Sequence, residues 1–194
     1  SSIPTNWELA FFPLDTQEGQ DYLAEMQYCV DFALANRKLM MENIKNCISE
    51  VCPTTFEPMI NIAHNYATME HHFEKDVMVH RKGATLAREG TIGIIPGSQG
   101  TKSYIVKGLG NPESFMSCSH GAGRKMGRNQ AIKNLNLADE IKRMDDQGIV
   151  HGLRTDKDLD EAAGAYKDID VVMNNQKDLV EILVELTPMA VIKG

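Results

Sequence analysis

Several features common in other classes of protein are missing from this chain. Its 194 residues contain no run of about 18 apolar residues, so we expect no transmembrane helix and no membrane partner. The N-terminus has no basic region followed by an apolar core, which argues against a secretory signal peptide. The cysteines form no C-x-x-C pair and show no zinc-ribbon spacing. We therefore expect reduced thiols in a cytoplasmic protein. The cysteines are Cys29, Cys47, Cys52 and Cys118.

An excess of positive charge is also missing. The chain has 27 acidic and 20 basic residues and a formal net charge of −7, which argues against broad attraction to nucleic acid. The bases nevertheless gather in the middle third of the chain, between glycine-rich turns, and this favours a local phosphate-facing patch over a mixed solvated surface. Its members are Arg81, Lys82, Arg88, Lys102, Lys107, Arg124, Lys125 and Arg128.

The composition that remains is that of an ordinary globular domain, with 42% hydrophobic and 24% charged residues. Apolar residues at intervals of three to four predict a helix over residues 16–50, which Pro53 ends. Asp15 and Glu18 have the spacing of a capping box at its start. A second amphipathic helix is predicted over 168–186, and helical character over 121–147 with a break near 134–136.

Between these helical regions the apolar runs are short, β-branched or aromatic, and bounded by glycine and proline. They predict strands at 60–62, 77–79, 92–95 and 104–106, with loops at 64–72, 81–90, 96–102 and 108–113. Short strands are also expected at 149–153 and 189–192. The predicted fold class is α+β, with central, mostly antiparallel strands flanked by amphipathic helices.

The most informative segment is Ser119-His120-Gly121-Ala122-Gly123-Arg124, which we expect to lead into a helix. Glycines leave backbone N–H groups free to approach an anion, and a helix N-terminus adds partial positive charge. A phosphate bound there would lie against His120, whose neutral imidazole is a competent nucleophile. The alternative interpretation is an ordinary glycine turn with a surface histidine.

Other motifs occur in a fixed order around this segment. They are His64-Asn65-Tyr66, His80-Arg81-Lys82-Gly83-Ala84-Thr85, Pro96-Gly97-Ser98-Gln99-Gly100-Thr101, Gly108-Leu109-Gly110-Asn111, Gly164-Ala165-Tyr166-Lys167 and the final Lys193-Gly194. In this order they resemble the C-terminal half of the RtcB family of RNA-splicing ligases. The resemblance runs from about Gln17 to Gly194. It implies that residues 1–194 are the nucleotide-binding half of a larger RtcB-type domain, without the N-terminal half that carries most of the metal site.

The resemblance also implies a reaction. Family members are GTP- and manganese-dependent ligases that join RNA 3′-phosphate or 2′,3′-cyclic phosphate ends to 5′-hydroxyl ends through a histidine–GMP intermediate. The matching nucleophile here is His120, and His64 is the matching metal ligand. The P-G-S turn is physically suited to a nucleotide because its free N–H groups can approach phosphate or ribose, although a tight turn between strands would look the same. The GMP or GTP site implied by the resemblance comprises His64, Asn65, Pro96, Gly97, Ser98, Gln99, Ser103, His120, Gly121, Ala122, Gly123, Tyr166 and Lys193, with Ser103, Tyr166 and Lys193 on the guanine.

Arg81 and Arg124 are expected to contact phosphate or RNA. The expected partners are GTP, RNA with broken or spliced tRNA-like ends, the missing N-terminal half, and a second copy through exposed apolar surface.

The chain departs from the family pattern in several places. Of the family's manganese ligands only His64 is present, because the chain contains neither D-x-G-C-G nor G-N-H. Gln99 stands where many members carry methionine, and Gly127 where serine is usual. We therefore expect the chain alone to be inactive as a ligase. Two alternatives remain open, namely a phosphohistidine phosphotransferase that uses His120 and a non-enzymatic, truncated relative that binds RNA or a partner.

Overall fold

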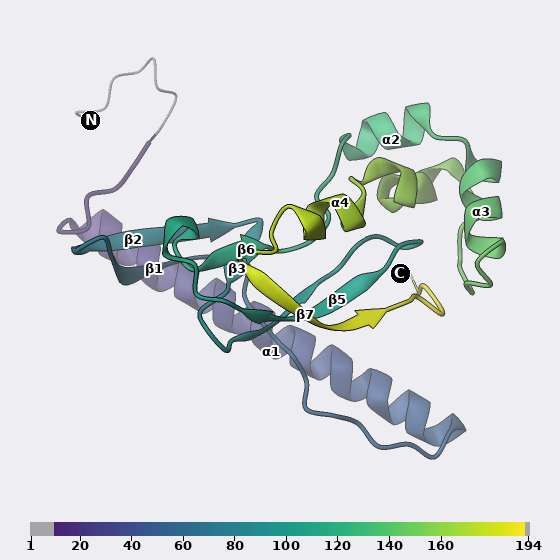
Figure 1. Ribbon diagram of the computed structural model, residues 1–194, viewed down its shortest axis with the longest axis horizontal. Helices are drawn as coiled ribbons and strands as arrows, with labels where there is room; N and C mark the ends of the chain where they lie inside the picture. Colours follow the sequence, from purple (N-terminus) through teal and green to yellow (C-terminus); the bar gives the residue numbers. More distant parts are fainter. Residues whose placement is uncertain (1–9, 193–194) are drawn as a thin grey trace.

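A computed structural model describes residues 10–192, beginning with a long helix, α1 (Gln17–Val51). The predicted helix is confirmed, but the predicted capping box is wrong by one residue. Thr16 is the N-cap, and its Oγ1 accepts a hydrogen bond of 3.2 Å from the backbone N–H of Gly19. Figure 1 shows α1 running along the β1–β2 hairpin and extending past the rest of the molecule.

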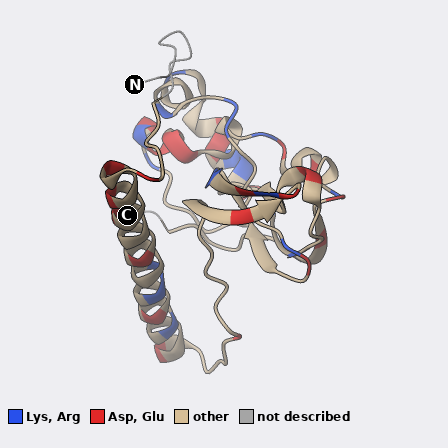
Figure 2. Cartoon of the chain, turned by 90° about the vertical axis from the view of Figure 1, so that its left-hand side faces the viewer, with Lys and Arg blue, Asp and Glu red and all other residues tan. Residues whose placement is uncertain are grey.

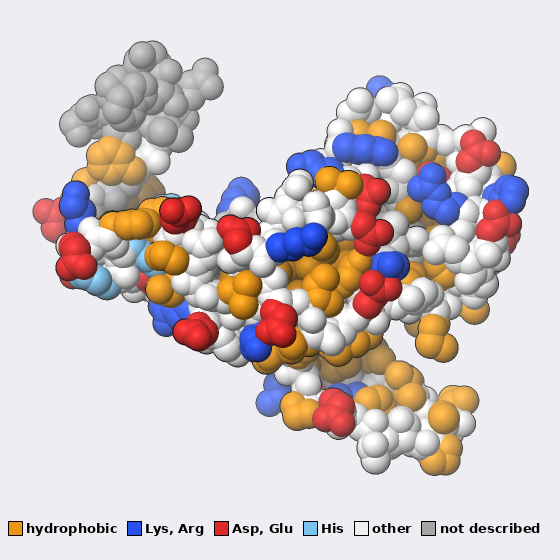
Figure 3. All heavy atoms as spheres, in the orientation of Figure 1, with side chains coloured by type: hydrophobic (Ala, Val, Ile, Leu, Met, Phe, Trp, Pro, Cys, Tyr) orange, Lys and Arg blue, Asp and Glu red, His pale blue; other side chains and the backbone are white. Residues whose placement is uncertain are grey.

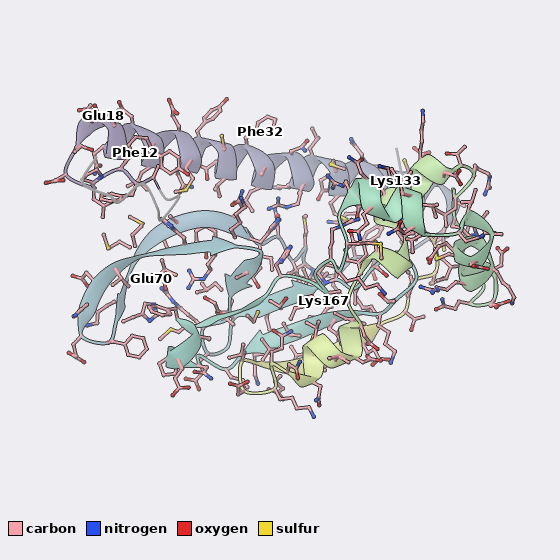
Figure 4. All side chains as sticks on the ribbon, turned by 90° about the horizontal axis from the view of Figure 1, so that it is seen from above. Phe12, Glu18, Phe32, Glu70, Lys133 and Lys167 are labelled. Atoms are coloured by element: carbon pink, nitrogen blue, oxygen red, sulfur yellow. The ribbon has the colours of Figure 1, made fainter. Side chains whose placement is uncertain are left out.

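The apolar side of α1 is largely uncovered. Gly19 is its only buried residue, and Phe32 is 65% exposed and points away from the rest of the molecule (Figure 4). The exposed large apolar residues of the helix are Tyr22, Tyr28, Phe32, Leu39, Met40, Ile44, Ile48 and Val51. Helices of this kind draw most of their stability from packing of the apolar face, and α1 receives little of it here.

Strands β1 (Asn65–His72) and β2 (Lys75–Lys82) form an antiparallel hairpin. The prediction of a loop over 64–72 is wrong, and so is the predicted strand at 60–62, which lies in irregular chain. The hairpin turns at Phe73 and Glu74, whose φ angles are +50° and +61°. A turn of this kind normally carries asparagine or glycine, so its usual sequence signal is missing.

The other strands form two further sheets. β3 (Ala84–Leu86) pairs with β6 (Ser117–Ser119), while β4 (Ile92–Ile95), β5 (Ser103–Gly108) and β7 (Val180–Leu186) form an antiparallel sheet in that order. The strands predicted at 92–95 and 104–106 are confirmed. Apolar side chains over β7 are visible near the centre of the face in Figure 3. The main core comprises Ala87, Ile95, Tyr104, Val106, Cys118, Ala122, Ile169, Met173 and Val180.

The remaining elements are short. They are η2 (Pro112–Ser114), α2 (Arg128–Asn134), α3 (Leu137–Asp145), η3 (Asp156–Glu161), η4 (Ala163–Ala165) and α4 (Ile169–Asn174). The predicted break near 134–136 is confirmed, since Asn136 caps α3. The predicted helix over 168–186 is wrong, because α4 ends at Asn174 and the β-branched run after it forms β7.

The predicted strands at 149–153 and 189–192 reduce to one parallel bridge between Val150 and Ala190 within the described residues. The α+β class with antiparallel strands is confirmed, although the strands form three small sheets. No helix among residues 10–192 combines the length and apolar character needed to cross a membrane.

Candidate functional site

Two of the predicted site residues, His64 and His120, lie against each other. Their imidazole rings are stacked, with centroids 5.2 Å apart and planes inclined by 16°. His64 directly precedes β1, and His120 directly follows β6. Gly83, in the turn between β2 and β3, joins them through its backbone: its N–H donates to the His64 carbonyl (3.2 Å), and its carbonyl accepts from the His120 N–H (3.4 Å).

Gly83 also lies close to the His120 ring. Its φ angle is +72°, and a Cβ added there would lie 3.5 Å from Cε1 of His120. Any side chain at this position would have to adopt a strained left-handed conformation beside the imidazole. The turn between β2 and β3 therefore depends on glycine to bring the two histidines together.

The His120 ring is buried at Nδ1, and this atom has no hydrogen-bond partner among the described residues. Buried polar atoms without a partner are rare and often mark functional sites. The chain after His120 differs from expectation, because residues 121–127 are not helical and α2 begins only at Arg128. The predicted support from a helix N-terminus is therefore wrong, and the ring is positioned by packing against His64 and Gly83 instead.

The charge state of His64 follows from its surroundings. Burial lowers the pKa of His64, and repulsion from His120 and from Arg37 lowers it further. This environment favours the neutral imidazole, which is the form that binds metal ions.

Arg37 belongs to α1 and was not predicted as a site residue. It donates to Oδ1 of Asn61 (2.9 Å) and to the carbonyl of Ile62 (3.1 Å), while Asn61 donates to the carbonyl of Leu34 (3.0 Å). These bonds fasten the irregular segment before His64 to the helix. A hollow of about 420 Å³ lies between α1 and the hairpin and is lined in part by Arg37, His64 and Asn65. No sequence pattern identifies Arg37, because its role depends on how the helix packs.

A manganese site is not completed by these residues. No group of three or more histidine, cysteine, aspartate or glutamate side chains suited to a metal occurs among residues 10–192. A catalytic metal generally needs about three protein ligands. His64 is available as one ligand, so the described part of the chain does not by itself fit the metal.

The Pro96–Ser103 loop lies next to the His120 turn. The Pro96 carbonyl accepts from the Ala122 N–H (3.0 Å), and a Cβ on Gly121 would lie 3.1 Å from that carbonyl oxygen. The loop is closed by the Ser98 N–H, which donates to Oγ1 of Thr101 (2.7 Å), and by the Gly97 N–H, which donates to Oγ of Ser103 (3.4 Å).

Gly97 is required by this tight closure, since a Cβ there would lie 2.2 Å from the Lys102 carbonyl oxygen. Gln99 lies half-buried in the same loop. Pro96 is thus the residue through which this loop contacts Gly121 and Ala122.

Tyr166 and Arg124 form a second part of the site. Tyr166 lines a hollow of about 450 Å³ together with Gly100, Thr101 and Lys125. The guanidinium of Arg124 lies over the Tyr166 ring, 4.9 Å from its centroid. The residues expected to contact guanine are Ser103, Tyr166 and Lys193, and of these Lys193 lies outside the described residues.

Arg81 occupies a different environment from the one expected. It is 1% exposed and forms a bidentate pair with Glu70, with NH1–Oε1 and NH2–Oε2 distances of 2.5 and 3.0 Å. It also donates to Oγ of Ser117 (3.0 Å) and to the carbonyl of Phe115 (2.9 Å). This buried guanidinium is not available to an RNA phosphate, contrary to the prediction, and instead ties the hairpin to the segment that enters β6.

Ion pairs with acidic residues also interrupt the predicted basic patch. Lys102, Lys107 and Arg128 form ion pairs with Glu185, Glu181 and Glu161, respectively. Figure 2 accordingly shows lysine and arginine interspersed with aspartate and glutamate over the strands and small helices. The basic residues predicted from the sequence do not form a single uninterrupted positive surface.

Comparison with known proteins identifies relatives in a single family. The family model described as "RtcB: tRNA-splicing ligase RtcB" matches residues 2–194. The chain is 43% identical over 194 residues to the RNA-splicing ligase RtcB of Escherichia coli strain K12, an alignment that covers 96% of the chain and 47% of the relative.

More distant relatives show the same coverage. The chain is 33% identical to the RNA-splicing ligase RtcB of Mycobacterium tuberculosis and to the tRNA-splicing ligase RtcB of Nanoarchaeum equitans, over 96% of the chain in each case. These alignments cover 48% and 45% of the two relatives. The chain spans about half the length of the curated relatives it matches.

Proposed function

This chain belongs to the RtcB family of tRNA-splicing ligases, and we propose from that premise that it forms the nucleotide-binding half of a GTP-dependent RNA ligase. The complete protein would join an RNA 3′-phosphate or 2′,3′-cyclic phosphate to a 5′-hydroxyl. The observation that carries the proposal is the stacked pair of His64 and His120, joined through Gly83 and adjoining the Pro96–Ser103 loop.

In this proposal His120 is the nucleophile. An imidazole nitrogen of His120 attacks the α-phosphorus of GTP, so that a P–N bond forms and the bond to the pyrophosphate leaving group breaks. An oxygen of the RNA 3′-phosphate then displaces the histidine and takes the GMP. The 5′-hydroxyl attacks the activated RNA phosphorus, loses its proton, and releases GMP. The packing of His120 against His64 and Gly83 holds the ring in place for the first attack.

The nucleotide would extend from His120 along the Pro96–Ser103 loop toward Tyr166. Asn65, Ser98 and Gln99 are proposed to line the nucleotide, with Ser103, Tyr166 and Lys193 on the guanine. Manganese, when bound, would neutralise phosphate charge during the attack. His64 would be one of its ligands, and the others would come from polypeptide outside this chain.

The proposal is tested in a chimera in which this chain replaces the corresponding half of the E. coli RNA-splicing ligase. With α-labelled GTP and manganese, the chimera should form an acid-labile, base-stable GMP adduct, and His120→Ala should abolish it. The matched control is His71→Ala, because His71 is 62% exposed at the far tip of the hairpin. An adduct that persists in His120→Ala would remove His120 from the reaction.

The label distinguishes the alternatives. Retention of the γ-label in place of the α-label would favour a phosphohistidine phosphotransferase. The 194-residue chain alone should not join RNA ends, because it supplies one metal ligand. We also propose a cytoplasmic location, which the four free cysteines support.

A further inference from the structure

Arg124 directs its guanidinium into the protein. Five N–H donors are available on an arginine, and four hydrogen bonds engage all three nitrogens of this one. Nε donates to the Met126 carbonyl (3.0 Å), NH1 to Oε2 of Glu161 and to the Tyr166 hydroxyl (both 3.1 Å), and NH2 to the Asp160 carbonyl (2.5 Å). Little capacity remains for a phosphate.

The Tyr166 hydroxyl is held by the same group of residues. It donates to Oε2 of Glu161, and Arg128 donates to the other carboxylate oxygen at 2.9 Å. Burial alone would raise the pKa of Glu161, but hydrogen bonds from Tyr166 and Arg128 outweigh it and lower the pKa. Burial raises the pKa of Tyr166, as does its bond to Glu161. A neutral phenol therefore donates to the Glu161 carboxylate at neutral pH and accepts from Arg124.

Backbone pairing connects this group to the His120 turn. The Lys125 N–H donates to the Ala165 carbonyl and the Lys167 N–H to the Gly123 carbonyl, each at 2.9 Å. Arg124 and Tyr166 thus face each other in an antiparallel bridge. The position of the Tyr166 ring relative to the glycine turn is set by this pairing and by the guanidinium above it.

The two side chains differ in their relation to the hollow. Tyr166 lines the hollow of about 450 Å³, whereas Arg124 is not among its lining residues. We propose that Arg124 is a positioning residue that holds the Tyr166 ring in place for stacking by the guanine base and makes no contact with the phosphates of GTP. This inference rests on the proposed function, which puts the base against Tyr166.

The proposal depends on the shape of the arginine side chain as well as its charge. A guanidinium is planar, stacks on aromatic rings and presents its donors in a fixed fork, whereas a lysine ammonium is a flexible point charge. Lysine at position 124 would keep the positive charge near the site and lose the flat surface over the ring. Arg124→Lys therefore separates a positioning role from attraction between Arg124 and phosphate.

The experiment measures binding of guanosine and of GMP to the 194-residue chain by NMR titration. The two ligands differ by the phosphate alone. We expect Arg124→Lys to weaken both by the same factor, about tenfold, because the loss lies at the base. Arg154→Lys, a conservative change at an exposed arginine outside the site, should change either affinity less than twofold. Weaker GMP binding with unchanged guanosine binding would overturn the proposal and make Arg124 a phosphate ligand.

A second measurement requires no ligand. In a chain with isotope-labelled tyrosine rings, the Tyr166 signal is assigned by its loss in Tyr166→Phe. Arg124→Lys should shift and broaden this signal and leave those of Tyr22, Tyr28, Tyr66 and Tyr104 unchanged. An unaltered Tyr166 signal in Arg124→Lys would overturn the positioning role. Wild-type chain that binds neither ligand would instead count against the nucleotide site itself, and the ring signal would still decide the role of Arg124.

Discussion

Arg81 and Arg124 are expected from the sequence to do the same work, yet the structure gives them different environments. Arg81 is almost fully buried and pairs with Glu70, whose side chain is 3% exposed. Arg124 pairs with Glu161, and both of these side chains are 26% exposed. The first guanidinium joins the hairpin to the chain entering β6, and the second covers an aromatic ring beside a hollow.

Both arginines are hydrogen-bonded within the protein. Those bonds alone therefore do not decide whether an arginine stabilises the fold or orients a neighbouring side chain. A fully buried pair must remain intact because water cannot replace a lost partner. A partly exposed pair can lose a partner at lower cost, so its effect is greatest on the group that it orients. Arg81 should therefore affect mainly stability, and Arg124 mainly ligand binding.

The largest expected effect is that of Arg81→Ala. We expect it to lower the free energy of unfolding by about 3 kcal/mol, because the buried Glu70 would lose its bidentate partner and keep only His72 and the more distant Arg88. Urea denaturation of the 194-residue chain measures this loss. The double substitution Arg81→Met/Glu70→Leu should recover part of it, since the buried ion pair is removed as a whole while His72 loses its bond to Glu70. A loss below about 1 kcal/mol for Arg81→Ala would mean that water reaches the pair and that the comparison fails.

The next largest effect is on how the free energy of unfolding depends on pH. Hydrogen bonds from Arg81 hold the pKa of Glu70 at about 2, against an ordinary value of 4.5, even though burial opposes the shift. A depressed carboxyl pKa gives stability that is present above the unfolded value and lost as the pH falls toward 2. The difference in unfolding free energy between wild type and Glu70→Gln should therefore be about 3 kcal/mol above pH 5 and shrink steadily below it. Urea denaturation across this range measures it, and a constant difference would contradict the assignment.

The smallest expected effect is the loss of fold stability when Arg124 is replaced. Arg124→Ala should lower the free energy of unfolding by only about 1 kcal/mol, because water can solvate the partly exposed Glu161 after the change. The same denaturation series provides the comparison with Arg81→Ala. A loss as large as that of Arg81→Ala would make Arg124 a structural residue and would weaken the argument for positioning Tyr166.

The sequence predicts the elements whose signals are local and long. An apolar spacing sustained over many turns predicts the helix over residues 16–50, and the break predicted near 134–136 coincides with the Asn136 cap of α3. The predicted strand at 77–79 lies within β2 and is confirmed, but its pairing with β1 is not predicted, because Phe73 and Glu74 adopt left-handed conformations without glycine. The run after Asn174 was read as helix because its apolar residues satisfy a helical spacing, whereas pairing with β5 decides its structure.

The site residues remain a prediction, and the structure adds contacts that the sequence does not predict. The motifs group His64, His120 and the Pro96–Ser103 loop, and the structure shows His64 stacked on His120 and Pro96 bonded to Ala122. The links through Gly83 and Arg37 depend on how separate elements pack, which no local pattern records. The roles of Arg81 and Arg124 were missed for the same reason, because their acidic partners lie 11 and 37 residues away in the sequence.

The Gly83 N–H donates to the His64 carbonyl, and the Gly83 carbonyl accepts from the His120 N–H. The two histidines are therefore linked through one residue. A displacement of the hairpin would therefore be expected to move His64 and, through Gly83, His120 as well. This path from the hairpin to His120 consists of backbone hydrogen bonds alone. This linkage makes position 83 a place where one substitution disturbs both rings, and where natural variation should be far narrower than at the exposed residues around it.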